Sequence, residues 1–371
     1  MKPIVFLLIA AILNSCNLKN MYETISNEDI MLNNAKQPFE ISNEKMLIKT
    51  KIKGKSETLL FDTGATLHVL TDSLLFNINS KGNRVEPSFN LITTPDNNNV
   101  ETMMGNFNIE TQILEGKPSS ANFIEMNFNK CDSIKGVFSP YNFIQEGKII
   151  EINFSENFIK ISDSVDVSNF KQVEAEFSKV GYLKISLRLN NKKEWFIFDT
   201  GADLPLICTQ RIMNRNPNSK YLTINNLSYT NNIQNNIREI NIYKNIQFLM
   251  GNYKGLVDVS SGMEVSNNIM GLMFIKRFNW IIDAKNKRVF FKERDNDRVF
   301  SASSRQYYCK NYKNLLVISA KNKNNKDFQL GDQIISVNNT LVAKDNLCDI
   351  QNYLNNTTDW STIKIKTQKL N

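Results

Sequence analysis

The sequence predicts a mainly β protein that contains one β-rich unit twice and then a smaller α+β unit. Short runs alternate apolar and polar residues or are wholly apolar, which is typical of half-buried and buried strands. Long helical patterns are scarce, and Asn-rich turns separate the runs. The same order of segments then recurs at a spacing of 137 residues, from position 62 to position 199. A repeat of this size indicates a duplicated lobe rather than a solenoid, whose repeats are far shorter.

Each copy of the repeat opens with two predicted strands joined by a polar turn. The first copy has them at 47–52 and 58–61, and the second has them at 183–189 and 195–198. Both wholly apolar strands end at the same four residues, which are Asp62-Thr63-Gly64-Ala65 and Asp199-Thr200-Gly201-Ala202.

Each copy continues with an apolar segment that contains a glycine. We align Ile134-Lys135-Gly136 with Ile269-Met270-Gly271, within the matching segments 133–138 and 268–274. A strand, a turn and another strand follow in each copy, predicted at 149–154, 158–161, 280–283 and 288–291. Short helical turns are expected at 71–75 and 274–277.

These paired motifs resemble the aspartic peptidases, and the lobe size resembles the retropepsin-like branch; the resemblance covers about residues 40–295. It implies two β-barrel lobes related by a pseudo-twofold axis, with an active-site cleft between them. It also implies that Asp62 and Asp199 are catalytic and that Thr63 and Thr200 hydrogen-bond across the lobe interface. The supporting and cleft residues that it implies are Gly64, Ala65, Gly201, Ala202, Asp203, Ile134, Gly136, Ile269 and Gly271.

The chemistry explains the need for two carboxylates. Two carboxylates held close together do not both ionise readily, so one keeps a proton while the other acts as a base. Such a pair deprotonates a shared water and polarises the scissile carbonyl without a cofactor or a metal. Two alternatives stay open: a pair of turns with no chemistry, and a duplicated lobe that has lost activity.

The two halves of the predicted site differ in sequence. Lys135 stands where Met270 stands in the second copy, and we expect it to reach solvent or a carboxylate because a buried lysine is costly. Thr66 stands where the second copy has Asp203. The two sides of the cleft are therefore expected to be non-equivalent.

A flap is predicted over the site. The polar turn 94–99 lies between candidate strands 89–93 and 100–109, and an equivalent turn lies near 230–232, beside Tyr229. The alternative is that both are ordinary surface hairpins.

The N-terminus has the layout of an export signal, with Lys2 before the apolar stretch 4–13. Leu13-Asn14-Ser15-Cys16 resembles the lipobox of bacterial lipoproteins, which makes residues 1–16 the signal peptide and Cys16 the lipidated residue. Residues 17–38 would then be a tether. The protein is thus expected to be an exported, membrane-anchored lipoprotein of the cell envelope, with a plain secretory peptide as the alternative.

Cysteine, histidine and charge narrow the function further. An exported location permits disulfides, and a bond between Cys309 and Cys348 would close the C-terminal module, although the sequence leaves the pairing open. The single histidine, His68, argues against a multi-histidine zinc site and is expected to be a packed structural residue. The net charge is +8, but its lysines are dispersed, so nucleic acid is a poor candidate partner and an anionic membrane surface is a better one.

The C-terminal unit, 299–371, is predicted to be a separate α+β domain after lobes at 39–165 and 172–295. The run from Leu330 to Asn339 resembles the signature of PDZ domains. Strands at 314–319 and 362–367 and a helix at 346–354 fit that order. The resemblance implies that the domain grips a peptide C-terminus by strand addition, and a structural cap on the lobes is the alternative.

Together these features predict an aspartic endopeptidase whose substrate is a polypeptide. The alternatives are a catalytically silent, peptide-binding scaffold of the cell envelope and an enzyme that cleaves only itself.

Overall fold

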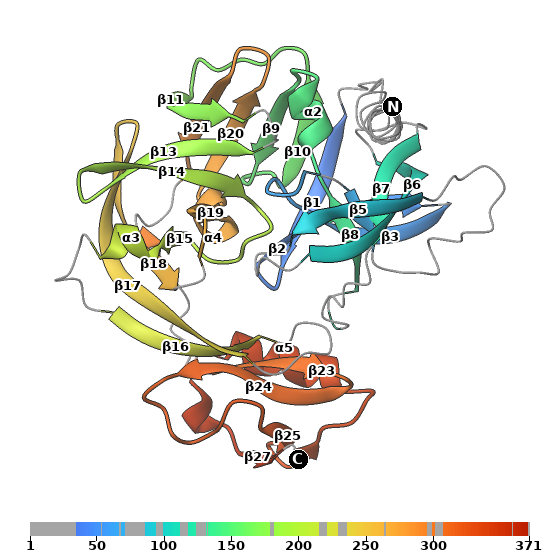
Figure 1. Ribbon diagram of the computed structural model, residues 1–371, viewed down its shortest axis with the longest axis vertical. Coiled ribbons are helices and arrows are strands. Elements are labelled where there is room, and N and C mark those ends of the chain that lie inside the picture. Colours follow the sequence, from blue (N-terminus) through green and yellow to red (C-terminus); the bar gives the residue numbers. More distant parts are fainter. Residues whose placement is uncertain are drawn as a thin grey trace, which may run out of the picture.

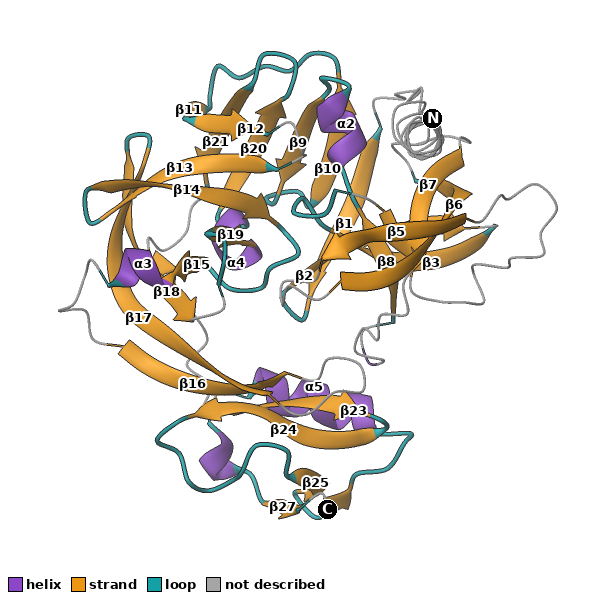
Figure 2. Ribbon diagram, in the orientation of Figure 1, coloured by secondary structure: helices purple, strands orange, loops and turns teal. Residues whose placement is uncertain are grey.

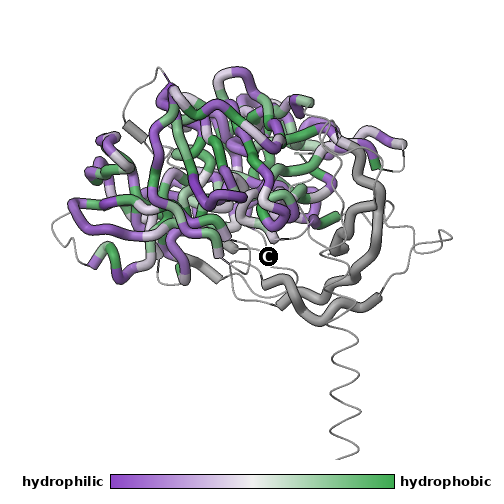
Figure 3. Tube along the Cα trace, turned by 90° about the horizontal axis from the view of Figure 1, so that it is seen from above, coloured by the Kyte–Doolittle hydropathy of each residue, from purple (hydrophilic) through white to green (hydrophobic). Residues whose placement is uncertain are grey.

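The computed structural model describes residues 35–52, 54–66, 68–70, 86–93, 99–111, 118–123, 131, 133–178, 182–214, 221–228, 236–262, 265–294, 299–300, 307–357 and 359–369. Within these ranges the protein is mainly β, and its few helices are short (Figure 2). Figure 3 shows hydrophobic and hydrophilic residues alternating along much of the chain, the pattern from which the strands were predicted.

Six strands close a barrel in the first half of the described chain (Figure 1). Each pairs with the next, and the last pairs back to the first, in the order β2 (Lys45–Ile52), β3 (Lys55–Phe61), β8 (Ile134–Phe138), β4 (His68–Leu70), β7 (Pro118–Phe123) and β6 (Asn99–Glu110). A further strand, β5 (Glu86–Thr93), pairs with β6.

Six strands of the second half, again counting described residues only, close a barrel in the same way. Their order is β13 (Leu183–Leu189), β14 (Lys192–Asp199), β19 (Ile269–Gly271), β15 (Leu206–Thr209), β18 (Tyr253–Gly262) and β17 (Asn236–Met250), with β16 (Tyr221–Ser228) paired to β17. Every pairing runs in the same direction as its equivalent in the first barrel: β3–β8 and β14–β19 are parallel, as are β4–β7 and β15–β18, and the others are antiparallel. The repeat in the sequence is thus a repeat of strand topology.

A sheet shared by both halves holds the two barrels together. Its order is β11 (Lys171–Val173), β21 (Arg288–Glu293), β20 (Phe278–Asp283), β9 (Ile149–Asn153), β10 (Phe158–Ser162) and β1 (Lys36–Ser42). At its centre β9 pairs with β20, and Glu151 lies opposite Ile281. These two residues hold the same place in their own hairpins, so β9 and β20 are equivalent strands that pair with each other in antiparallel fashion. The sheet also brings β1 into the fold, so the predicted tether ends before Lys36 rather than at residue 38.

One hydrophobic core runs through both barrels and the shared sheet. It contains Phe61 and Phe138 from the first barrel and Phe198 from the second, together with Trp280 of β20. All four side chains are fully buried. Burial of this kind is the main stabilising contribution to the two-barrel body.

The glycine-containing segment of the second half holds a strand and then a helix. Within 268–274, β19 ends at Gly271, and the helix α4 (Leu272–Ile275) follows at once. The helical turn expected at 274–277 is this helix, two residues earlier, and the turn expected at 71–75 lies outside the described residues. The other short helices of the barrels are α2 (Tyr141–Gln145) and α3 (Gln210–Met213), and the short strands β12 (Ala175–Phe177) and β22 (Val299–Phe300) pair with β13 and β18.

The strand register also corrects the alignment of the two copies. In the second barrel, Asp199 lies opposite Gly271. In the first, Phe61 lies opposite Phe138, which sets Asp62 beside Ser139. Ser139, not Gly136, is therefore the structural equivalent of Gly271. The predicted departure at Lys135 disappears, because the apolar pair equivalent to Ile269-Met270 is Val137-Phe138.

The C-terminal module has its own small core. It consists of β23 (Tyr307–Tyr312), β24 (Leu315–Asn322), β25 (Gln333–Val337), β26 (Thr340–Leu341), α5 (Leu347–Asn356), the 3₁₀ turn η2 (Trp360–Thr362) and β27 (Ile365–Gln368). The predicted helix and both predicted strands are present, with their ends shifted by one to three residues. Tyr307, Ile318, Leu354 and Trp360 are buried in its core.

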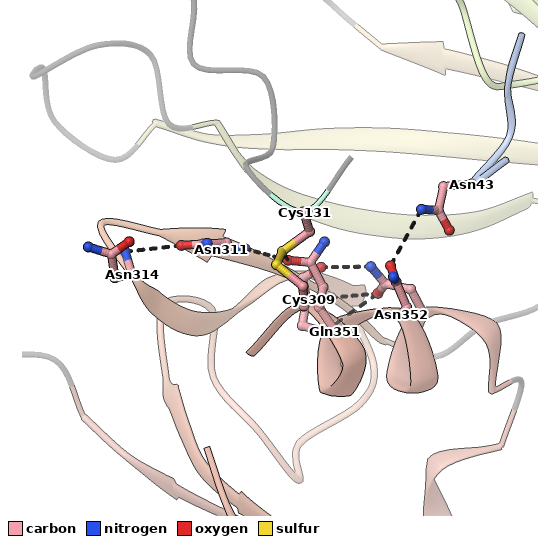
Figure 4. Close-up of a disulfide and its surroundings, with 9 residues drawn as sticks. Asn43, Cys131, Cys309, Asn311, Asn314, Gln351 and Asn352 are labelled. Carbon is pink, nitrogen blue, oxygen red and sulfur yellow. Dashed lines mark hydrogen bonds between the residues drawn. A yellow bond between two sulfur atoms is a disulfide. The ribbon is translucent and has the colours of Figure 1, made fainter. Parts of the chain in front are cut away.

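This module is attached to both barrels. Its strand β24 pairs with β16 of the second, with Ile224 opposite Asn322. A disulfide joins Cys348 of α5 to Cys131, which precedes β8 of the first (Figure 4). The module thus bridges the two barrels on the side away from the shared sheet (Figure 1).

The Cys309–Cys348 disulfide that the sequence allows does not form, because Cys348 is bonded elsewhere. Cys309 of β23 is buried and is not part of a disulfide. Its backbone N–H donates to Oδ1 of Asn355 (3.1 Å) and its carbonyl accepts from Nδ2 of Asn355 (2.9 Å). Cys348 is bonded to Cys131, which packs against the core of the module. A partner 217 residues away cannot be found from local spacing.

The predicted signal peptide and Cys16 lie outside the described residues. Across the part of the chain that is described, no helix is both long and apolar enough to cross a bilayer.

Candidate active site

The two Asp-Thr-Gly-Ala motifs meet where the two barrels touch. Asp62 directly follows β3, and Asp199 is the last residue of β14. The two strands end at equivalent places because they have equivalent neighbours. β3 lies between antiparallel β2 and parallel β8, and β14 lies between antiparallel β13 and parallel β19. The two strand ends contact each other at the junction of the barrels.

Four hydrogen bonds made by the two motif threonines hold the two loops together. Oγ1 of Thr63 donates to the carbonyl of Phe198 (2.8 Å) and accepts from the backbone N–H of Thr200 (3.0 Å). Oγ1 of Thr200 makes the reciprocal pair, with the carbonyl of Phe61 (2.7 Å) and the N–H of Thr63 (3.0 Å). Both threonines are buried, with 3% and 1% of their surface exposed. Because each bond crosses from one barrel to the other, the separation of the strand ends is tightly constrained.

Each carboxylate is held by its own loop. Oδ1 of Asp62 accepts from the N–H groups of Gly64 (2.8 Å) and Ala65 (3.1 Å). Oδ1 of Asp199 accepts from Gly201 (2.8 Å) and Ala202 (3.2 Å) in the same way. Two backbone donors per carboxylate fix the rotation of each carboxyl group.

The glycines of the motifs let each carboxylate pack against the opposite loop. A β-carbon on Gly64 would lie 2.5 Å from Cγ of Asp199, and one on Gly201 would lie 2.5 Å from Cγ of Asp62. Either distance is a severe clash, so only glycine is compatible with the pairing. The crossed contacts place the two carboxyl groups face to face.

The environment raises the pKa of both acids. Burial raises the pKa of Asp62, although the hydrogen bond with Asp199 opposes this. Burial and repulsion from Asp62 raise the pKa of Asp199 well above its usual range. Both residues are half-buried, so they keep some contact with solvent. The geometry therefore favours a pair that holds one proton and can reach a water molecule.

The other predicted site residues lie around this pair in different ways. Asp203 is exposed and Ile269 is half-buried on β19, whereas Ile134 is buried in an apolar cluster with Leu60 and Val137. Gly136 and Gly271 pack closely against backbone: added β-carbons would lie 2.1 Å from the carbonyl oxygen of Val69 and 2.0 Å from that of Leu204. Their glycine character is explained by this packing.

Both predicted flap hairpins have their strands, but the tips at 94–98 and 229–235 lie outside the described residues. In the first barrel, β5 and β6 pair up to Thr93 opposite Asn99. In the second, β16 and β17 pair up to Ser228 opposite Asn236. The second hairpin is also fastened to the C-terminal module through β24, so the two hairpins have different surroundings.

In a PDZ-like module, the free edge of β23 would receive a peptide. Two backbone N–H groups on this edge are already hydrogen-bonded to side chains of the same module. The N–H of Cys309 donates to Asn355, and the N–H of Asn311 donates to Oε1 of Gln351 (2.8 Å). Both acceptors come from α5 (Figure 4 shows Gln351 beside the disulfide). These are the donors that an added strand would use, so the structural alternative for this module gains support.

His68 is buried, as expected of a structural residue, with 4% of its surface exposed. It packs on Phe138 with ring centroids 4.7 Å apart, and its Nδ1 accepts from the N–H of Ser139 (3.0 Å). Burial lowers the pKa of His68 to about 4, so the ring is neutral near neutral pH. Lys135 is half-buried.

Ser139 is the residue at this site that the motif search missed. Its hydroxyl donates to the carbonyl of Ala65 (2.6 Å), inside the first Asp-Thr-Gly-Ala motif. The only signal in the sequence is its place after the apolar pair Val137-Phe138, which the Gly136 alignment concealed.

Neither the protein-family models nor the curated proteins include a match to this chain. Among the described residues, no group of three or more His, Cys, Asp or Glu side chains is arranged to hold a metal ion.

Proposed function

We propose that this protein is an aspartic endopeptidase, with its two barrels as retropepsin-like lobes and polypeptides as its substrate. The observation that carries the proposal is the crossed packing of Asp62 and Asp199, each against the glycine of the other motif. Two turns without chemistry would need neither the four threonine hydrogen bonds nor a pair of carboxyl groups with raised pKa values.

The proposed mechanism needs only this pair and one water. The ionised member takes a proton from the water as it attacks the peptide carbonyl, and the protonated member donates to the developing oxyanion. The resulting tetrahedral intermediate collapses when the pair returns a proton to the leaving amine. No covalent acyl-enzyme forms and no cofactor is required. The proton belongs to the pair, so neither residue is assigned as the sole acid.

The rest of the chain fits a role outside the cytoplasm. We propose that Cys16 carries a lipid that anchors the protein to a membrane of the cell envelope, and the Cys131–Cys348 disulfide is compatible with an oxidising compartment. In this proposal the C-terminal module, PDZ-like in the order of its elements, is a clasp between the lobes. Its β23 edge is already satisfied, which disfavours capture of a peptide C-terminus there.

The test is cleavage of a diverse peptide pool by the purified wild type between pH 3 and pH 7, with products identified by mass spectrometry. Asp62→Asn and Asp199→Asn are expected to abolish cleavage, because either change removes the acid or the base from the pair. Asp345→Asn is the matched control: it alters an exposed carboxylate in the C-terminal module, outside the predicted site, and should retain activity. Undiminished cleavage by both active-site variants would refute the proposal. Peptide binding without cleavage at any pH would favour the silent scaffold.

A further inference from the structure

The chain segment at the end of β8 in the first barrel is held by different hydrogen bonds from the equivalent segment at the end of β19 in the second. In the second half, two backbone amides hold it: the N–H of Gly271 donates to the carbonyl of Pro205 (3.0 Å), and the N–H of Leu272 donates to the carbonyl of Ala202 (2.7 Å). The second bond matters for the site, because the N–H of Ala202 donates to Asp199. The peptide units on both sides of Ala202 are therefore fixed.

In the first half, the second of these backbone bonds has no equivalent. Ser139 takes the place of Gly271, and the next residue is Pro140, which has no N–H to donate. The loop is also one residue shorter: six steps separate Asp62 from His68, the first residue of β4, whereas seven separate Asp199 from Leu206, the first residue of β15. The second loop therefore has one residue more in the stretch that includes Pro205.

Side chains make hydrogen bonds at both positions. Nδ1 of His68 accepts from the N–H of Ser139 (3.0 Å), as the carbonyl of Pro205 does for Gly271. Oγ of Ser139 donates to the carbonyl of Ala65 (2.6 Å), as the N–H of Leu272 does for Ala202. The same Oγ accepts from the N–H of Tyr141 (3.1 Å), which leaves its single proton for Ala65.

We propose that Ser139 is a positioning residue for the catalytic pair, whose hydroxyl fixes the first loop as the Leu272 amide fixes the second. This inference rests on the proposed function for its catalytic readout. The link to Asp62 is short: the carbonyl of Ala65 receives the Ser139 hydroxyl, and the N–H of Ala65 donates to Oδ1 of Asp62 (3.1 Å). Because Ser139 is 3% exposed, no bulk water can take over this bond.

The decisive test is a loss and a rescue. Ser139→Ala removes the donor and should lower kcat/KM by about tenfold, mostly through kcat, as expected for one buried hydrogen bond. Adding Pro140→Leu restores a backbone N–H at the position equivalent to Leu272 and should recover most of the activity. The matched control is Ser162→Ala in β10, because that hydroxyl also donates to a backbone carbonyl, that of Ser164 (2.9 Å), and is equally buried. The control should keep wild-type activity.

Hydrogen exchange gives a readout that does not depend on catalysis. The amides of Gly64 and Ala65 should exchange faster in Ser139→Ala than in the wild type, return toward wild-type rates in the double variant, and stay unchanged in Ser162→Ala. Ser139→Thr keeps the hydroxyl and should protect these amides, which covers the case in which the alanine variant fails to fold. Equal exchange and equal activity in the Ser139→Ala and Ser162→Ala variants, or a double variant no better than Ser139→Ala, would overturn the inference. An inactive wild type would refute the proposed function instead, while the exchange comparison would still decide the role of Ser139.

Discussion

Replacing Thr200 by valine tests whether the threonine bonds hold the two carboxylates together. The change keeps the shape of the side chain and removes only the hydroxyl. The N–H of Thr63 and the carbonyl of Phe61 then lose the hydrogen bonds of 3.0 and 2.7 Å that they make with it. Thr200 is 1% exposed, so water is excluded from both groups.

The expected cost follows from those two groups. An unsatisfied buried donor or acceptor costs about 1–3 kcal/mol, so the free energy of unfolding should fall by about 2–6 kcal/mol. The strand ends are then free to shift, and a displacement of about 1 Å at a catalytic pair lowers the rate by about a hundredfold. Thr200→Ser is the matched control. It keeps both hydrogen bonds and loses one methyl group, which costs about 1 kcal/mol.

The assay combines urea unfolding at a constant m-value with kcat/KM on one peptide substrate. The valine variant should be clearly weaker than the serine variant in both measurements. The reasoning is refuted if Thr200→Val and Thr200→Ser unfold at the same urea concentration and cleave at the same rate.

Four further predictions concern the same site and its supports. Gly64→Ala should lower kcat at least a hundredfold in a folded protein, measured on the same peptide, because its β-carbon would lie 2.5 Å from Cγ of Asp199. Asp199→Asn should melt at a higher temperature than the wild type at pH 7, but this gain should be absent below pH 3.8. The raised pKa of Asp199 makes the folded state hold a proton that the unfolded chain releases, so the stability of the wild type falls as the pH rises above 3.8. His68→Leu should abolish the loss of wild-type stability between pH 6.5 and about 4, about 3 kcal/mol, because a buried neutral histidine with a lowered pKa destabilises the fold as acid charges it; a variant that keeps the wild-type slope in urea titrations would contradict this. Cys348→Ser removes the disulfide to Cys131 and should lower the free energy of unfolding by about 2–4 kcal/mol, measured as a lower melting temperature. A thiol reductant should lower the melting temperature of the wild type by the same amount and leave that of the variant unchanged.

The strands and the active-site motifs could be predicted because their signals are local. Alternation and apolar runs located β13 at Leu183–Leu189 without error, and the Asp-Thr-Gly-Ala repeat located both strand ends. The hydrogen bonds between Thr63 and Thr200 were implied by the resemblance rather than by any local pattern.

The remaining features depend on residues that are distant in the chain. Closure of each barrel and the pairing of β9 with β20 join segments that no local pattern relates. The pairing of β16 with β24 attaches the module beside the barrels, and this brings Cys348 to Cys131. The spacing of the cysteines in the sequence gives no sign of this contact. The alignment of Gly136 with Gly271 failed because Gly136 also follows an apolar residue and also packs closely against backbone, at the carbonyl of Val69. These features make the two glycines look equivalent although they occupy different register positions. Only the strand register identified Ser139 as the equivalent of Gly271.

The most direct test of the central claim is a carbon-13 titration of the aspartate carboxyl groups, with Asp62→Asn and Asp199→Asn used to assign the two resonances. The structure predicts that the two acids titrate as a coupled pair, with one proton retained well above the usual range because burial and mutual repulsion oppose the second ionisation. It also predicts that removing either acid changes the titration of the other. Two independent titrations near pH 4, each unaffected by the loss of its neighbour, would contradict the paired site and the proposed water activation with it.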